Sequence, residues 1–360
     1  MPCSPENKKG ATLKSLTNTQ SNLKTPTILD TTLRDGSYVI DFQFSASETF
    51  RISKKLDDLG FELIEIGHGT GLGSSEKNLS KAAATDEEYL KAGSEAVDKG
   101  KWGMFAIPGI AEVRHLELAA SYGMDFVRIG TEVASVDKGR QLIDAAKKLG
   151  LYVHCNLMKT YVATPEYFAA QAAICFEMGA DAVYIVDSAG GMLPIEIQAY
   201  IEAFRTVNPK GTLGFHGHNN LGLAVANSLH CALNGVDIID TSLQGLGRSA
   251  GNTPISQYLA VLTRMGFSHR FDLIDVMASS EELARPLVRN IGIDTIDVTA
   301  GLAQFHSGFL GAVQKAADAN DIDVRRLIIE LCQLDRQKAD QQLINVAVTN
   351  VQKSLKVLRS

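Results

Sequence analysis

The sequence predicts an α/β protein built on a (β/α)8 barrel, or TIM barrel, with a C-terminal helical appendage. Three observations favour this fold. A short β-branched run, a loop and an amphipathic stretch recur eight times between residue 27 and about residue 265. The runs are separated by roughly 25 to 35 residues, which is the length of one strand–helix unit. The glycine fingerprint of an open dinucleotide-binding sheet is absent after the first run. We therefore expect a closed barrel over residues 27–267.

Each expected strand is a run of five or six mostly apolar residues bounded by loop residues, a pattern typical of buried strands. In chain order the expected strands are Thr27–Thr32, Glu62–Ile66, Trp102–Ile107, Phe126–Gly130, Tyr152–Leu157, Ala182–Val186, Gly214–His218 and Ile238–Ser242.

The intervening helices carry signals at both ends. Residues Ser45 to Glu48 form a capping box ahead of an apolar-periodic stretch that begins at Phe50. Glycines stand just before the following strand, where helix C-caps belong. These glycines are Gly60, Gly100, Gly123, Gly150 and Gly179.

The two ends of the chain depart from this repeat. Residues 1–26 are rich in Ser, Thr, Asn and Lys and lack an apolar segment, which predicts a disordered N-terminal tail rather than a signal peptide. Residues 268–360 carry helical patterns at Asp272–Arg289, Leu310–Asn320 and Val324–Leu334, followed by an alternating stretch at 344–348. We expect a helical C-terminal domain packed over the barrel mouth, and a purely structural cap is the alternative.

Composition excludes several classes of function. The net charge of −6 and the lack of any basic block argue against a nucleic-acid-binding surface. The longest apolar runs are no longer than a strand, so we expect no membrane span. The five cysteines are scattered without the spacing of a metal site, which is typical of reduced thiols in a cytoplasmic protein.

Two polar motifs follow strands that are far apart in the sequence. Residues 30–36 read Asp-Thr-Thr-Leu-Arg-Asp-Gly, and residues 216–220 read His-Gly-His-Asn-Asn. Because alternate side chains of a strand point the same way, His216 and His218 project from one face. Two imidazoles and the Asp35 carboxylate would make a facial set of three ligands that leaves positions open for a substrate. The pattern therefore indicates a metal enzyme.

Further polar residues fall at the carboxyl ends of the expected strands, where a barrel places its catalytic groups. They are Arg34 and Asp35, Glu65 and His68, Asp187 and Ser188, and the two histidines. For Glu65 we weigh orienting a ligand, bracing Arg34 and an internal ion pair. Arg128 is expected in a buried salt bridge.

With these residues in place, the chain resembles the family of pyruvate-handling metal barrels that includes HMG-CoA lyase, isopropylmalate synthase and 4-hydroxy-2-oxovalerate aldolase. The resemblance is greatest to the aldolase branch. It rests on Asp30–Gly36, Ile64–Ser75, Pro108–Ile110, Asp187–Met192, His216–Leu221, Gly245–Asn252, Arg285–Leu287 and Ser307–Phe309, which occur in the same order.

The resemblance implies a divalent-metal-dependent (class II) aldolase that cleaves or forms a 4-hydroxy-2-oxo acid from pyruvate and an aldehyde through an enolate. Asp35, His216 and His218 would hold Mn²⁺ or Mg²⁺. Arg34 would stabilise the enolate oxygen, and Ser188 would bind the pyruvyl carboxylate. From their positions alone, Glu65 and His68 are added as candidate substrate-binding residues. Asn252 matches an asparagine that approaches the metal in the lyase branch.

The chain departs from the aldolase pattern at the acid/base residues. Tyr38 stands where the aldolase has a histidine, and His306 stands where it has a tyrosine. We expect the two to meet over the metal as an exchanged pair, with His306 carrying the proton because a phenol is a poor base. The alternative is that Tyr38 only packs, that His306 lies on a surface, and that the substrate differs from hydroxyoxovalerate.

Two other functions stay open. An arginine in the loop Gly245–Asn252 is reminiscent of acyl-CoA-dependent 2-oxo acid synthases of the isopropylmalate or homocitrate type. A partner-binding barrel is the third, because hydroxyoxovalerate aldolases pair with an acylating aldehyde dehydrogenase. We also expect a homo-oligomer.

Overall fold

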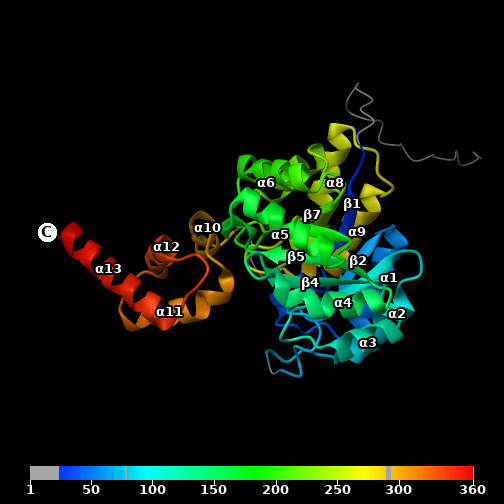
Figure 1. The fold of residues 1–360 in the computed structure, drawn as a ribbon, viewed down its shortest axis with the longest axis horizontal. Coiled ribbons are helices and arrows are strands. Elements are labelled where there is room, and N and C mark those ends of the chain that lie inside the picture. The colour runs from blue at the N-terminus through cyan, green and yellow to red at the C-terminus, as the bar shows by residue number, and fades with distance from the viewer. Residues whose placement is uncertain (1–23, 78, 289–292, 360) are drawn as a thin grey trace, which may run out of the picture.

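The computed structural model describes residues 24–77, 79–288 and 293–359. Eight parallel strands close into a barrel in chain order, with a helix after each strand (Figure 1). The predicted α/β barrel with C-terminal helices is thus confirmed. The strands are β1 (Thr27–Asp30), β2 (Leu63–Ile66), β3 (Lys101–Ala106), β4 (Phe126–Glu132), β5 (Tyr152–Met158), β6 (Ala182–Asp187), β7 (Thr212–Gly217) and β8 (Ile238–Thr241). Every expected strand is present, with bounds that differ by no more than two residues.

Pairing of the first and last strands closes the barrel, with Thr27 beside Ile238 and Asp30 beside Thr241. Two sets of side chains then fill the space. An inner cluster that includes Leu29, Phe126 and Tyr184 fills the barrel interior. A larger apolar cluster packs the outer strand faces against the surrounding helices. Polar groups at the carboxyl ends of the strands are therefore held on a rigid rim.

The barrel helices begin and end largely as their capping signals predict. They are α1 (Ala46–Leu59), α2 (Asp86–Ala96), α3 (Val113–Ser121), α4 (Arg140–Lys148), α5 (Pro165–Glu177), α6 (Pro194–Val207), α7 (Ala224–Leu233) and α8 (Ile255–Met265). The Ser45 hydroxyl accepts from the Glu48 N–H, and the Glu48 carboxylate accepts from the Ser45 N–H, as a capping box requires.

Four of the five predicted glycine caps adopt the left-handed conformation that ends a helix, namely Gly60, Gly123, Gly150 and Gly179. The prediction for Gly100 is wrong, because α2 already ends at Ala96 and Gly100 does not have a positive φ. Its requirement for glycine is steric. A Cβ at this position would lie 2.6 Å from the Phe61 carbonyl oxygen.

The described part of the C-terminal region contains five α-helices: α9 (Leu273–Leu283), α10 (Thr295–Ala303), α11 (Leu310–Ala319), α12 (Val324–Leu334) and α13 (Gln341–Arg359). Helix α9 packs against α8 and α1 and joins the barrel's apolar cluster. Helices α10 to α13 enclose a second cluster around Val313, Leu327 and Ile344, and they project from the barrel in Figure 1. The sequence did not identify α10, and the alternating stretch at 344–348 lies within α13.

Two segments bear on the expected domain division, which stays a prediction. The expected disordered tail falls mostly outside the described residues, although Lys24 forms a single bridge with Ser268. The segment His306–Phe309, between α10 and α11, lines the cavity at the barrel mouth. No helix in the described part of the chain has the length and apolar character needed to cross a membrane.

Candidate metal centre and active site

Three predicted metal ligands converge at the barrel mouth. Asp35 opens a short 3-10 helix (Asp35–Ile40) after β1, His216 lies near the end of β7, and His218 follows that strand. One potential ligand atom from each lies within 4.8 Å of the other two, and all three side chains are buried. The strand alternation that places His216 and His218 on one face is thus present, and the rings stand nearly perpendicular at 86°.

The hydrogen bonds around the three ligands leave atoms free to coordinate. Asp240 on β8 accepts from Nδ1 of His216 at 2.8 Å, which leaves Nε2 with a lone pair. Nδ1 of His218 and Oδ1 of Asn252 are buried without a hydrogen-bond partner among the described residues. A buried polar atom without a partner is costly, so these residues fit a bound divalent ion.

The electrostatics also keep two of the predicted ligands, Asp35 and His218, in their metal-binding forms. Burial alone would raise the pKa of Asp35, but Arg34 and the imidazoles of His218 and His216 lower it well below its usual range. Burial lowers the pKa of His218 to about 4, with a partly opposing effect from Asp35. At neutral pH the centre thus offers a carboxylate and a neutral imidazole, as coordination requires.

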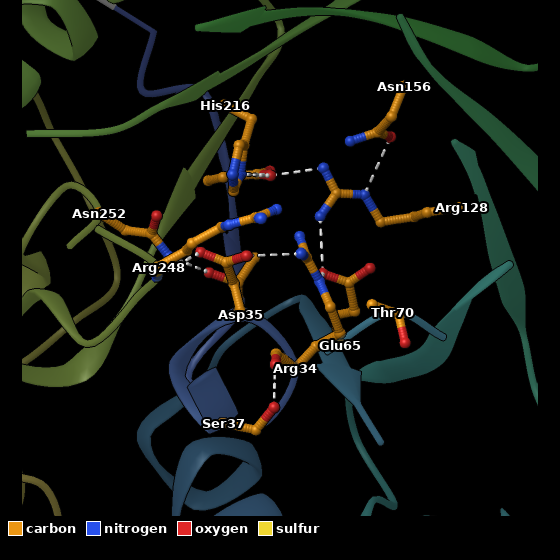
Figure 2. Close-up of polar contacts among 12 residues, drawn as sticks. Arg34, Asp35, Ser37, Glu65, Thr70, Arg128, Asn156, His216, Arg248 and Asn252 are labelled. Carbon is orange, nitrogen blue, oxygen red and sulfur yellow. Dashed lines mark hydrogen bonds and ion pairs between the residues drawn. The ribbon is translucent and has the colours of Figure 1, made fainter. Parts of the chain in front are cut away.

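A chain of buried ion pairs braces this centre (Figure 2). Arg34 donates to Asp35 at 2.7 Å and to Glu65 at 2.8 Å. Glu65 also accepts from Arg128 at 2.8 Å, and Arg128 in turn pairs with Asp240. Of the roles weighed for Glu65, the structure thus supports the brace for Arg34 and the internal ion pair. The buried salt bridge expected for Arg128 is present.

A cavity of about 260 Å³ opens directly onto the ligands. Seven of the predicted site residues line it: Arg34, Asp35, Tyr38, Ser188, His216, His218 and His306. Glu65, His68 and Asn252 do not line it. A larger hollow of about 580 Å³ lies at the opposite end, around the first residues of several strands, and contains none of the predicted site residues.

Ser188 and His68 differ in what they can offer a substrate. The Ser188 hydroxyl oxygen accepts from the Lys159 N–H at 3.0 Å, so its own proton remains available for a substrate carboxylate. The His68 ring is buried, stacks on Phe42 at 4.2 Å, and bonds to the Ser80 carbonyl and the Thr70 N–H. His68 therefore shapes the loop that brings Thr70 to the cavity.

Comparison with known proteins agrees with this geometry. Residues 25–283 match the family model described as HMGL-like. The chain belongs to the HMGL-like family.

Relatives of this HMGL-like chain extend over nearly its whole length. It is 39% identical to 4-hydroxy-2-oxovalerate aldolase of Carboxydothermus hydrogenoformans, over 88% of this chain and 94% of that protein. It is 37% identical to the enzyme of the same name from Pseudoalteromonas translucida, over 94% and 98% of the two chains.

Solved structures of lower identity share the fold. HMG-CoA lyase from Brucella melitensis aligns with a TM-score of 0.63 at 19% identity, over 74% of this chain and all of that one. The carboxyl transferase domain of Rhizobium etli pyruvate carboxylase aligns with a TM-score of 0.73 at 16% identity, over 93% and 62%.

Tyr38 and His306, which the sequence led us to expect as an exchanged pair, both border the cavity. The His306 Nδ1 accepts from the Gly308 N–H at 3.1 Å. A neutral ring in this arrangement carries its proton on Nε2. Burial, together with Arg248 and Lys159, lowers the pKa of His306 to about 2, so the ring is neutral. In this state His306 presents a donor, whereas the sequence led us to expect a base.

Sequence reasoning did not predict three further residues of this HMGL-like site, although it noted the loop arginine, Arg248, for the synthase alternative. Asp240 orients His216, Arg248 lines the cavity, and Lys159 lines it while pairing with Glu132 at 2.9 Å. Asp240 had a signal, since it is a carboxylate within an apolar strand that pairs with β7. Arg248 and Lys159 lie on loops, whose paths at the barrel mouth no sequence pattern predicts.

Proposed function

We propose that this HMGL-like chain is a class II aldolase, a carbon–carbon lyase that cleaves or forms a 4-hydroxy-2-oxo acid from pyruvate and an aldehyde. One observation carries the proposal. The Asp35, His216 and His218 cluster faces a cavity in a chain that is 39% identical to a 4-hydroxy-2-oxovalerate aldolase over most of its length.

The reaction breaks the C3–C4 bond of the substrate and leaves its electron pair on C3, as the enolate of pyruvate. The C4 hydroxyl gives its proton to water in the cavity and becomes the aldehyde, and C3 takes a proton from water, so no proton is consumed overall. Mn²⁺ or Mg²⁺ held by Asp35, His216 and His218, with Asn252 in support, would act as a Lewis acid toward the 2-oxo acid.

Different residues of the protein bind the two halves of the substrate. Arg34, kept in place by Glu65 at 2.8 Å, supplies a permanent positive charge toward the enolate oxygen. Ser188 donates its free hydroxyl proton to the pyruvyl carboxylate. His306 and Tyr38 meet the C4 oxygen from the other wall of the cavity, with His306 acting as a neutral hydrogen-bond donor.

The proposed setting and assembly follow from the same resemblance. We infer a cytoplasmic enzyme, which the four free cysteines among the described residues support. A homo-oligomer and a complex with an acylating aldehyde dehydrogenase remain predictions, which size-exclusion chromatography with and without such a dehydrogenase can test.

The test is to supply 4-hydroxy-2-oxovalerate to the Mn²⁺-loaded protein and to follow pyruvate with coupled lactate dehydrogenase. We expect pyruvate to form in proportion to enzyme and to stop on chelation. A parallel assay supplies acetyl-CoA with 2-oxo acids and measures free thiol. Release of CoA without pyruvate formation from the hydroxy acid would establish the synthase alternative instead.

A further inference from the structure

The cavity contains one cation whose charge the described protein residues do not neutralise. Arg34 pairs with Asp35 and Glu65, and Lys159 pairs with Glu132. The guanidinium of Arg248 forms no ion pair or hydrogen bond with the residues that the structure describes. Arg248 contacts the cluster through its backbone, whose N–H donates to Asp35 at 3.2 Å.

The Arg248 side chain is held at a defined place in the cavity. Its Cζ lies 5.0 Å from the centre of the Tyr38 ring, a cation–π contact that fixes the guanidinium without neutralising it. Its Nη2 approaches Gly308, where an added Cβ would lie 2.9 Å away. Figure 2 shows the side chain extending from its loop toward the centre of the polar cluster.

The loop that carries Arg248 is held by side-chain hydrogen bonds and contains a residue with an unfavourable backbone conformation. Ser249 adopts a positive φ of 57°, which is costly for a residue with a side chain. Its hydroxyl donates to Asp297 at 2.6 Å and accepts from Asn220 at 2.8 Å. Backbone strain maintained by such contacts is typical of positions that present a functional group.

The position of Arg248 indicates which part of the substrate it meets. The pyruvyl half belongs near the metal ligands, Arg34 and Ser188. Arg248 contacts Tyr38 and lies beside Gly308, two residues from His306, and we have placed these residues at the C4 oxygen. A half-buried guanidinium in a small cavity pairs with a carboxylate in two parallel hydrogen bonds.

We propose that Arg248 binds a carboxylate on the aldehyde-derived half of the substrate, so that the preferred substrate is a 4-hydroxy-2-oxo acid with a second carboxylate next to C4. This inference rests on the proposed aldolase function and narrows its substrate class. Glyoxylate would be the smallest aldehyde product of this kind, in contrast to the uncharged acetaldehyde from hydroxyoxovalerate.

A binding experiment tests Arg248 without requiring turnover. The probes are 2-oxoglutarate and 2-oxopentanoate, which differ by a carboxylate in place of a methyl group and lack the 4-hydroxyl needed for cleavage. Titration calorimetry on the Mn²⁺-loaded protein should show that 2-oxoglutarate binds about 10- to 100-fold more tightly. In Arg248→Gln this ratio should fall to within a few-fold of one. The exposed Arg140→Gln serves as the control and should retain the ratio.

Turnover then separates this inference from the proposed function. The wild-type kcat/KM for 4-hydroxy-2-oxoglutarate should exceed that for 4-hydroxy-2-oxovalerate, and Arg248→Gln should reduce the ratio about 10-fold or more. Equal loss on both substrates would place Arg248 on the pyruvyl half and overturn the inference, as would equal wild-type binding of the two probes. An Arg248-dependent binding preference without cleavage of either substrate would reject the aldolase and keep the carboxylate site.

Discussion

At the scale of single residues, the decisive question is what His306 does to the C4 oxygen. Its Nδ1 accepts from the Gly308 N–H, and its pKa is lowered to about 2, chiefly by burial and then by Arg248. A neutral imidazole in this state can donate through Nε2 and polarise an oxygen, and it is a weak base. The geometry therefore favours a donor over the base that the sequence suggested.

Two substitutions of His306 distinguish a donor from a base. His306→Ala removes both functions and should lower kcat on the order of 10²-fold. His306→Gln retains an N–H donor but cannot take up a proton, so we expect it to recover at least 10-fold of that loss. Steady-state assays of both variants, with Tyr38→Phe for comparison, provide the measurement. If Gln is as damaging as Ala, His306 transfers the proton itself.

Asp240 is a second residue whose role is testable by itself. It accepts from His216 Nδ1 at 2.8 Å and thereby fixes the ring with Nε2 toward the metal position. Asp240→Asn should weaken Mn²⁺ binding about 10- to 100-fold, because carboxylate partners of ligating histidines contribute that much to affinity. Asp237→Asn, which alters a partly exposed ion pair with Arg205, is the control. Unchanged Mn²⁺ affinity in Asp240→Asn would remove it from the centre.

Sequence reasoning identifies residues whose position follows from one strand. Asp35, His216 and Ser188 are of this kind, because strand ends and strand alternation place them at the rim. The role of Asp240 depends instead on which strand pairs with β8, and the position of Arg248 depends on the path of a loop. The proton position on His306 depends on a hydrogen bond to Gly308, which no spacing rule contains.

At the scale of elements, the strands were predictable and the ends of the helices only in part. The eight apolar runs form strands because each is buried on both faces in a closed parallel barrel. Gly100 does not end a helix. A glycine is needed there because a side chain would collide with the Phe61 carbonyl oxygen. Helix α13 was not predicted, because the alternating pattern at 344–348 is typical of a strand. In the structure its apolar residues pack against α11 and α12, in the second apolar cluster, rather than against a sheet.

The end of strand β1 should give the protein a pH-dependent stability. Burial raises the pKa of Asp30 to about 7. Hydrogen bonds from Thr32 lower this pKa, and the negative charges of Glu65 and Asp240 raise it further. Between about pH 4 and 7 the folded protein keeps a proton that the unfolded chain releases. The stability of the folded state therefore falls as pH rises, with a slope of about 1.4 kcal/mol per pH unit from this group.

Asp30→Asn removes this titration and isolates its effect. Relative to wild type, the variant should gain unfolding free energy as pH rises from about 4.5 to 6.5, by about 1 to 3 kcal/mol. Urea unfolding of both proteins at three pH values provides the measurement. Parallel pH profiles for the two proteins would show that Asp30 is ionised in the folded state.

At the scale of the whole molecule, the barrel brings groups separated by nearly two hundred residues into one cavity. Asp35 on the first unit meets His216 and His218 on the seventh because β1 and β7 both pair with β8. The C-terminal region adds His306 from outside the barrel. The barrel and the convergence of Asp35, His216 and His218 were thus accessible from the sequence, whereas the approach of residues 306–309 required the packing of the C-terminal helices.

The most direct test of the account is Mn²⁺ binding, measured by electron paramagnetic resonance, together with turnover before and after chelation. We predict one tight site per chain, loss of turnover with chelator, and recovery on adding Mn²⁺. Asp35→Asn and His216→Gln should bind Mn²⁺ at least about 100-fold more weakly while remaining folded. His230→Gln on the outer helix α7 should bind like wild type. Full turnover after exhaustive chelation, or undiminished Mn²⁺ binding in the ligand variants, would contradict the account.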